Sequence, residues 1–380
     1  MLPEYAPIRE MLQPAIGEEA ESLSFEEIIG FTQALSTRLS RVWSAIMAKP
    51  MLKALGEQLR SALPVAHANL RALAGRVETI AQTAERLAAE TDFAFLVEPG
   101  RGLLSIGYSV KSQKLHDACY DLLASEARMA TFLAVARGDL PQQSWFKLAR
   151  QHAHAFGRFV LYSWTGTMFE YLMPALWMES DEDTLLARSQ RECVEVQRAF
   201  ARTYGVPWGI SESGNATRNE HRHYGYHAYG VPQMALSADA GAGPVISPYS
   251  TFLALGVKTR EALRNLRQME SAGWVGAFGF YEAADYRASR ENPELVREWM
   301  AHHMGMSLLA VTNVLKDKVV RQWFHSNRLV QASELLLQEM PSRRGALYAA
   351  LEDIEPAPVS RDWRSTLRWF LHRPVRTQSA

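Results

Sequence analysis

The residues best suited to chemistry in this sequence are acidic side chains set among aromatic ones. Glu212 lies in the run GVPWGISESG, a turn-like stretch that also holds Pro207 and Trp208. Cleavage of a glycosidic bond requires carboxyl groups beside a flat apolar surface on which a sugar ring can lie. A solvated surface turn is the simpler interpretation, because glycine, proline and serine are common in such turns. The pattern makes Glu212 a candidate catalytic acid and leaves a structural role open.

Two further segments place carboxyl groups in apolar surroundings. The run GAFGFYEAADY carries Glu282 and Asp285 between tyrosines and phenylalanines, including Tyr281 and Tyr286. In SWTGTMFEYLMP, Thr165 is positioned to cap a helix that carries Glu170. Burial raises the pKa of a carboxyl group, which suits a general acid, although a buried ion pair explains the same pattern equally well.

Polar residues of two other segments are candidates for binding sugar hydroxyls. Asp121, Glu126 and Arg128 in YDLLASEAR are expected on an amphipathic helix, where charges ordinarily face water. Adjacent His302 and His303 point about 100° apart on a helix and cannot easily chelate one ion, so one is expected to be buried while the other faces a cleft. No metal site is predicted, because the histidines of HRHYGYHAYGVP lack a nearby cysteine or an HExxH helix.

Composition limits the class of partner. The 41 basic and 41 acidic residues balance, which argues against a nucleic acid or an anionic membrane surface and favours a neutral partner such as carbohydrate. The chain lacks GxxxxGK[ST], GxGxxG and GxSxG motifs, so no nucleotide or other cofactor and no nucleophilic serine are expected.

Cys119 and Cys193 lie in helix-like segments and suggest buried thiols, or one disulfide. No secretion signal and no apolar run of about 20 residues are visible, which predicts a cytoplasmic chain without a membrane span.

The elements that must position these residues are predicted to be mostly helices. Apolar residues recur every three or four positions from 25 to 89, and the run FAFLVEPGRGLLSIGY predicts a short hairpin. Many helices with chemically rich loops suggest an all-α toroid whose loops gather at one end. The expected domains are an N-terminal helical region (1–91), a catalytic domain (92–341) and a C-terminal tail (342–380). Beyond residue 92, helices are predicted at about 115–137, 141–155, 165–178, 182–204, 247–256, 258–272, 292–314 and 327–339.

Nine blocks then occur in a recognisable order: SIGY, YDLLASEAR, GTMFEYLMP, GVPWGISES, YGVP, PYSTFLAL, GFYEAADY, MAHHMGMS and ELLLQE. Over about residues 92–340 the chain resembles the glucoamylase-like central domain of bacterial cyclic β-1,2-glucan synthases. The resemblance implies an (α/α)6 toroid that closes linear β-1,2-glucan into a ring by retaining transglycosylation. It also implies glycosyltransferase and phosphorylase-like parts as partners, in a larger synthase at the inner membrane. An endo-β-1,2-glucanase and a non-catalytic glucan-binding or assembly subunit are the alternatives.

The resemblance also implies roles for individual residues. Two carboxyl groups should flank the bond, about 5 to 5.5 Å apart for a direct nucleophile and about 6.5 to 9.5 Å apart for inversion. Glu212 and Glu282 are the expected pair, with Glu170 third, and their separate roles stay open. Hydroxyl-binding residues are expected to be Asp121, Glu126, Arg128, Asp285, His302 and His303, and stacking residues Trp164, Trp208, Tyr226, Tyr281 and Tyr286.

Overall fold

The computed structural model describes residues 24–238 and 243–341. The C-terminal tail predicted at 342–380 lies outside these residues. By its internal contacts the chain divides into two compact units, Met1–Asp92 and Phe93–Ala380. Each unit has its own hydrophobic cluster and is described separately.

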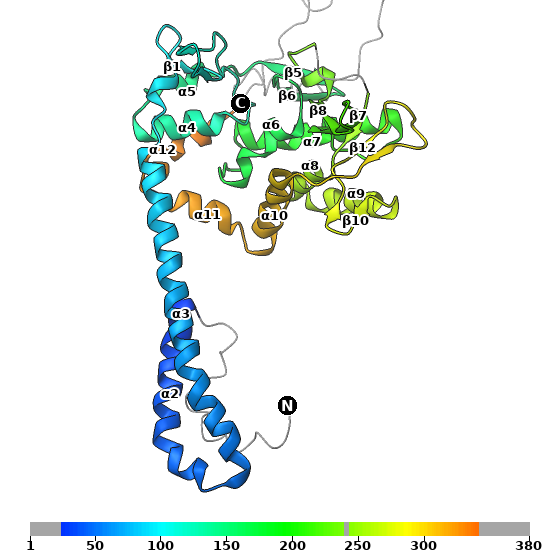
Figure 1. Cartoon of the computed structure of the whole chain (residues 1–380). Coiled ribbons are helices and arrows are strands. Elements are labelled where there is room, and N and C mark those ends of the chain that lie inside the picture. The colour runs from blue at the N-terminus through cyan, green and yellow to red at the C-terminus, as the bar shows by residue number, and fades with distance from the viewer. Residues whose placement is uncertain (1–23, 239–242, 342–380) are drawn as a thin grey trace, which may run out of the picture. The chain divides into compact units, whose positions relative to one another are not determined.

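The first unit contains two long helices, as the apolar spacing predicts. Helix α2 spans Phe25–Met47, and α3 spans Pro50–Glu90 and runs back along it (Figure 1). Ser24 caps α2 through a capping box, in which its side chain accepts from the Glu27 N–H and the Glu27 carboxylate accepts from the Ser24 N–H. Pro50 occupies the first turn of α3, where its missing N–H costs no hydrogen bond. The buried side chains between the helices are Leu39, Ile46, Leu52 and Leu63.

The second unit is rich in helices that pack around one large core. Within residues 24–238 and 243–341, none of the helices combines the length and apolar character needed to cross a lipid bilayer. The α-helices of this unit are α4 (Arg128–Arg137), α5 (Gln143–Lys147), α6 (Met168–Leu172), α7 (Leu185–Tyr204), α8 (Pro248–Leu253), α9 (Thr259–Ser271), α10 (Ala301–Leu315), α11 (Val319–His325) and α12 (Arg328–Ser333). Short 3-10 turns are η3 (Ala94–Leu96), η4 (Pro174–Leu176), η5 (Pro232–Met234), η6 (Ala254–Gly256) and η7 (Glu334–Gln338).

Small antiparallel sheets accompany these helices, so the fold is helix-rich rather than all-α. The predicted hairpin is present as β1 (Val97–Glu98) paired with β2 (Leu103–Leu104). Further pairs are β3 (Tyr108–Ser109) with β4 (Lys114–Leu115), β5 (His152–Ala155) with β6 (Arg158–Leu161), β7 (Glu212–Arg218) with β8 (Tyr224–Ala228), and β10 (Val275–Gly276) with β11 (Gly279–Phe280). A three-stranded sheet has the order β13 (Glu294–Val296), β12 (Ala283–Asp285), β9 (Val245–Ile246).

The helix predicted at about 115–137 begins only at Arg128. Backbone groups of the preceding segment bond to residues distant in the sequence instead, as Tyr120 N–H does to the Leu104 carbonyl at 2.9 Å. Leu123 N–H likewise donates to the Ala149 carbonyl at 3.2 Å. The prediction that Asp121 and Glu126 lie on a helix is therefore wrong, and both belong to the loop before α4.

Two other predicted helices are also too long. Residues 141–155 form the short α5 and then β5, because the chain reverses at Phe156 and Gly157, whose φ angles of 52° and 73° fit a hairpin turn. The segment predicted at 292–314 begins with β13, and α10 starts at Ala301.

Both cysteines are free, so no disulfide joins them. Cys193 is buried in α7 as expected. Cys119 is only partly buried and lies outside the helices, where its backbone forms an isolated antiparallel β-bridge with Ser105. The prediction of a helical Cys119 is therefore wrong.

Candidate functional site

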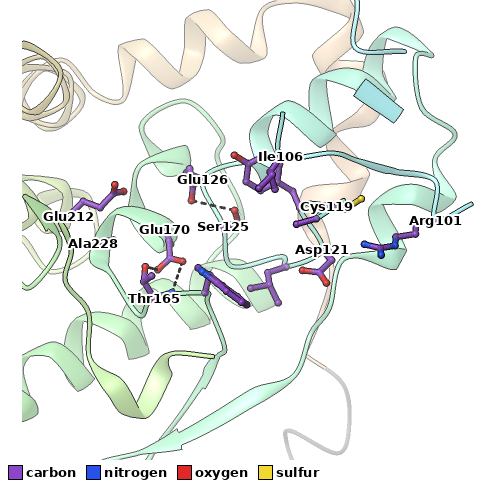
Figure 2. Close-up of a pocket in the computed structure, with 14 residues that line it drawn as sticks. Arg101, Ile106, Cys119, Asp121, Ser125, Glu126, Thr165, Glu170, Glu212 and Ala228 are labelled. Atoms are coloured by element: carbon purple, nitrogen blue, oxygen red, sulfur yellow. Dashed lines mark hydrogen bonds between the residues drawn. The ribbon is translucent and has the colours of Figure 1, made fainter. Parts of the chain in front are cut away.

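A pocket of about 480 Å³ in the second unit brings several of the predicted residues together (Figure 2). We call it the acidic pocket, because four carboxyl side chains line it. In Figure 2, Glu126 and Glu212 lie on the opposite side of the view from Arg101, and Glu170 is hydrogen-bonded to Thr165. The lining residues are Arg101, Ile106, Ala118, Cys119, Tyr120, Asp121, Leu122, Ser125, Glu126, Trp164, Thr165, Glu170, Glu212 and Ala228.

Glu212 is held in place through its backbone. It is the first residue of β7 and pairs with Ala228, and its carbonyl oxygen lies 3.0 Å from the Tyr249 hydroxyl. Its side chain is half-buried, and Tyr226 hydrogen-bonds to the carboxyl group. Burial, followed by the negative charge of Glu170, raises the pKa of Glu212, while His303 and the Tyr226 hydrogen bond partly oppose this rise.

Glu126 enters the same pocket from the loop before α4. Ser125 donates a hydrogen bond of 3.3 Å to its carboxylate. Burial raises the pKa of Glu126, and the charges of Glu170 and Glu212 raise it further. These two charges act on Glu126 because the three carboxyl groups lie close enough in the pocket to repel one another.

Arg128 positions this loop. Its side chain is 2% exposed, and its guanidinium donates to the carbonyl oxygens of Ser125, Glu170 and Tyr171 at 2.8 to 3.1 Å. Burial lowers the pKa of Arg128 to about 10. Predicted to bind hydroxyl groups, Arg128 lies instead under the pocket, where it joins the Glu126 loop to α6.

Glu170 is buried and fully engaged by its neighbours. Its carboxylate accepts hydrogen bonds from the hydroxyls of Ser163, Thr165 and Thr167 at 2.9 to 3.0 Å. The backbone N–H groups of Thr165 and Thr167 donate to it as well. Thr167 rather than Thr165 caps α6, in a capping box with Glu170. The hydrogen bonds therefore give Glu170 a structural task at the pocket wall.

Glu282 does not line the acidic pocket. It is 4% exposed, and its two carboxylate oxygens lie 2.9 and 3.0 Å from His303 Nδ1. The Gly214 N–H donates to it at 3.1 Å. The ring of His303 stacks on that of Tyr249 with 3.7 Å between their centroids, and the Tyr249 hydroxyl donates to the Glu212 carbonyl oxygen, so Tyr249 links this pair to the Glu212 backbone.

The remaining predicted residues are divided between the acidic pocket and other places. Asp121 and the exposed Trp164 line the acidic pocket. Trp208 belongs to the core, and its backbone bonds to Asn265. Four other predicted residues lie outside the acidic pocket. Asp285 forms an ion pair with Arg287 at 2.6 Å, and Tyr286 packs against Trp274. The other two are the partly buried Tyr281 and the exposed His302.

Sequence reasoning missed Tyr120 and Arg101. Burial raises the pKa of Tyr120, and the charges of Glu126 and Glu212 raise it further, so its ring lies near both carboxyl groups. Arg101 supplies the positive charge among the lining residues. Tyr120 is the first residue of the run YDLLASEAR, next to Asp121, and this position is a signal that could have found it. Among residues 24–238 and 243–341, no three histidine, cysteine or acidic side chains lie together as a metal site would require.

The arrangement can carry out acid-base and nucleophilic chemistry on a neutral ligand. A carboxyl group with a raised pKa stays protonated to higher pH and can donate a proton to a leaving oxygen. A second carboxylate in the same pocket can serve as nucleophile or base. Exposed Trp164 offers an apolar surface at the pocket wall.

Comparison with known proteins assigns the chain to a family. The family described as putative glucoamylase matches residues 119–328, more than half of the chain. This chain belongs to that glucoamylase family. It is also 40% identical over 290 residues to the cyclic β-(1,2)-glucan synthase NdvB of Rhizobium meliloti (strain 1021). The aligned region is 75% of this chain and 10% of that synthase, so the chain spans about a tenth of its relative's length.

Solved structures share the fold at low identity. A putative glucoamylase from Bacteroides fragilis NCTC 9343 aligns with a TM-score of 0.51 and 16% identity, covering 83% of this chain and 71% of that one. An endo-β-1,2-glucanase from Chitinophaga pinensis, in complex with sophorotriose and glucose, aligns with a TM-score of 0.50 and 15% identity. The alignment covers 83% of this chain and 72% of the glucanase chain. These likenesses show the fold alone.

Proposed function

We propose that this chain is a carbohydrate-active enzyme domain that closes linear β-1,2-glucan into cyclic β-1,2-glucan by retaining transglycosylation. The observation that carries the proposal is the acidic pocket, in which Glu126 and Glu212 both have raised pKa values beside Trp164. The 40% identity to a cyclic β-1,2-glucan synthase supports the substrate. The aligned region is only 10% of that synthase, which leaves room in it for the glycosyltransferase and phosphorylase-like parts that the family resemblance implies as partners.

Glu212 and Glu126 form the catalytic pair in this proposal. Glu282 was the partner expected from the sequence, but its bonds to His303 and the Gly214 N–H occupy its carboxylate outside the pocket. Glu170 is occupied in the same way by its capping box. In the part of the chain that the structure describes, the Glu126 carboxylate accepts from the Ser125 hydroxyl and from its own backbone N–H, which leaves it available to substrate.

The reaction needs two displacements to keep the β configuration. One carboxyl group donates its proton to the glycosidic oxygen while the other carboxylate bonds to the anomeric carbon. A hydroxyl of the same glucan chain then attacks that carbon, breaks the enzyme bond and returns its proton to the first group. One glycosidic bond is broken, another is formed, and no water is consumed.

The toroid and the domain division belong to the same proposal. We infer that the second unit is built on an (α/α)6 toroid, with 1–91 preceding it, 92–341 forming it and 342–380 following it. The fold shared with putative glucoamylases supports this inference.

Hydrolysis of the glucan is the second candidate function. The fold shared with an endo-β-1,2-glucanase favours it, since water could replace the acceptor hydroxyl at the same pair of carboxyl groups. The two functions differ in whether the chain that leaves the enzyme is a ring or a shorter linear chain.

Consumption of linear β-1,2-glucan tests both functions together. Glu212→Gln should abolish it while leaving the fold intact, because the amide cannot donate a proton or form the covalent bond. Glu220→Gln is the matched control, since Glu220 is an exposed acid between β7 and β8. Full consumption by the Glu212→Gln variant would overturn the proposed site, and no consumption by the unaltered chain would overturn the proposed function.

A further inference from the structure

Helix α3 of the first unit has a narrow stripe of apolar side chains that repeats every seven residues. Successive members of the stripe are alternately four and three positions apart along the chain. The members are Leu59, Leu63, Ala66, Leu70, Leu73, Val77, Ile80, Ala84 and Leu87. This spacing is the heptad repeat of a coiled coil, in which such a stripe packs against a second helix with the same repeat.

Helix α2 covers the first part of this stripe. Leu59 and Leu63 pack in the hydrophobic cluster between the two helices, and the Thr32 hydroxyl of α2 lies 2.9 Å from His67 Nδ1. Beyond this point the large side chains of the stripe are mostly 46 to 68% exposed. These exposed side chains are Leu73, Val77, Ile80 and Leu87. We call the stripe over residues 70–87 the open stripe, and it continues the interface between α2 and α3.

The surroundings of the open stripe favour a second helix as its partner rather than a membrane. Residues 70–90 contain three arginines and three glutamates, so this part of α3 has no net charge that would attract an anionic lipid surface. Ala74 and Ala81 flank the stripe on one side, and their small side chains allow another helix to approach closely. A contiguous apolar surface of this kind usually marks an interaction site.

The open stripe is complementary to itself when two copies of α3 run in opposite directions. Antiparallel helices can be aligned so that Val77 of each copy faces Leu87 of the other. Ile80 then faces Ala84 of the second copy, so a large side chain meets a small one in the middle of the contact. The same contacts occur twice, related by a two-fold axis, as in most dimers of identical chains.

Charges at the edge of the stripe favour this antiparallel alignment. It places Arg76 of each copy opposite Glu90 of the other, at both ends of the contact. Glu90 already pairs with Arg86 of its own helix at 3.1 Å, and its carboxylate has acceptor sites for a second arginine. In a parallel pair Arg76 would lie beside Ala81 of the second copy and gain no ion pair.

We propose that two copies of this chain associate through the open stripes of α3, as a short antiparallel coiled coil. The contact between residues 70 and 87 is about 26 Å long, at 1.5 Å per helical residue. The inference is independent of the proposed function, because the acidic pocket is lined by residues of the second unit.

Sedimentation velocity of the full chain at rising concentration tests the contact. The mass should increase from 42.8 kDa, the mass of one chain, toward twice that value. Val77→Glu places an unpaired charge in the contact and should weaken association by about tenfold or more. Val65→Glu is the matched control, since it makes the same substitution at a 59% exposed position of α3 outside the stripe, and it should associate as the unaltered chain does. Circular dichroism shows whether both variants keep their helices.

Disulfide formation in air tests the orientation. Thr83 lies midway between Arg76 and Glu90 on the same edge of the stripe, so the two copies of Thr83 face each other in the antiparallel pair. Thr83→Cys should therefore cross-link the two chains, whereas a parallel pair would hold these positions on opposite edges. Gln82→Cys, on the outer face of α3, should cross-link no more than the unaltered chain with its own free cysteines.

Three results would overturn the proposal. The full chain could sediment as a single chain up to about 100 µM. Val77→Glu could associate as tightly as Val65→Glu. Thr83→Cys could cross-link no more than Gln82→Cys, which would exclude the antiparallel pair. None of these results bears on the proposed function, because neither assay uses glucan.

Discussion

At the scale of single residues, the acidic pocket works by keeping carboxyl groups close together and partly out of water. Burial and mutual repulsion raise the pKa values of Glu126 and Glu212. Arg128 and Tyr249 hold the backbone on either side, at Glu170 and Glu212. The pocket therefore stores repulsion that a more stable arrangement would avoid, as is common at catalytic sites.

Replacing Glu126 by glutamine should lower kcat/KM on linear β-1,2-glucan by about 10²- to 10⁴-fold, the usual contribution of a catalytic proton-transfer group. The amide keeps the size of the side chain and loses its proton chemistry. Glu282→Gln should lower kcat/KM less at equal folded fraction, because the Glu282 carboxylate lies outside the acidic pocket and is bonded to His303 and the Gly214 N–H. A larger loss from Glu282→Gln than from Glu126→Gln would restore Glu282 as the partner.

The raised pKa values also predict a dependence of stability on pH. The folded chain binds more protons than the unfolded chain between pH 4.5 and the raised values of Glu126 and Glu212. The stability that these groups contribute is therefore complete below pH 4.5 and is lost as the pH rises through the folded pKa values. Glu212→Gln should raise the melting temperature relative to the unaltered chain more at pH 8 than at pH 4. An equal difference at both pH values would contradict the electrostatic account.

At the scale of elements, short segments rather than long helices deliver the site residues. Glu212 begins β7, Glu126 lies in the loop before α4, and Glu170 lies in the five-residue helix α6. Such short elements depend on tertiary contacts and side-chain caps, because a single helical turn is not stable alone.

The capping box of α6 should accordingly be sensitive to substitution. Glu170→Gln should lower the free energy of unfolding by about 1 to 3 kcal/mol, because an amide nitrogen cannot accept the hydrogen bonds that Thr165 and Thr167 now donate. Urea denaturation measures this loss, and Thr167→Ser, which keeps the hydroxyl, is the control. Unchanged stability in Glu170→Gln would show that the carboxylate is not structural.

Local signals predicted some elements well and failed where distant backbone groups decide the structure. The apolar spacing that predicted α2 depends on residues within one or two turns of each other. The segment before α4 pairs with residues far away in sequence, which periodicity cannot reveal. The alternation His-Ala-His-Ala at 152–155, followed by Phe156 and Gly157, was a visible strand signal that a helical interpretation overlooked.

The candidate site was predicted in its chemistry but not in its pairing. Glu212, Trp164, Glu126 and Asp121 were among the predicted site residues, and all four line the acidic pocket. Which acid faces Glu212 depends on hydrogen bonds across long sequence separations, such as that of Glu282 with Gly214. No local pattern contains that information.

At the scale of the whole molecule, the lining of the acidic pocket lies entirely in the second unit, between residues 101 and 228. The first unit has a separate core formed by α2 and α3. Chemistry at the pocket should therefore be independent of the packing of the first unit.

Ile46→Ala should lower the free energy of unfolding of the first unit by about 2 to 5 kcal/mol, because this side chain is fully buried. Turnover of β-1,2-glucan should stay at the level of the unaltered chain. Met51→Ala, at an 82% exposed position of the same unit, controls for the substitution itself. Lost turnover in a folded Ile46→Ala protein would show that the first unit contributes to catalysis.

The masses of the products formed from linear β-1,2-glucan test the central claim most directly. Transglycosylation within one chain predicts species lighter by one water than linear chains with the same number of glucose units, formed by the unaltered chain and absent with Glu212→Gln. Products consisting of shorter linear chains alone would contradict ring closure and establish hydrolysis instead.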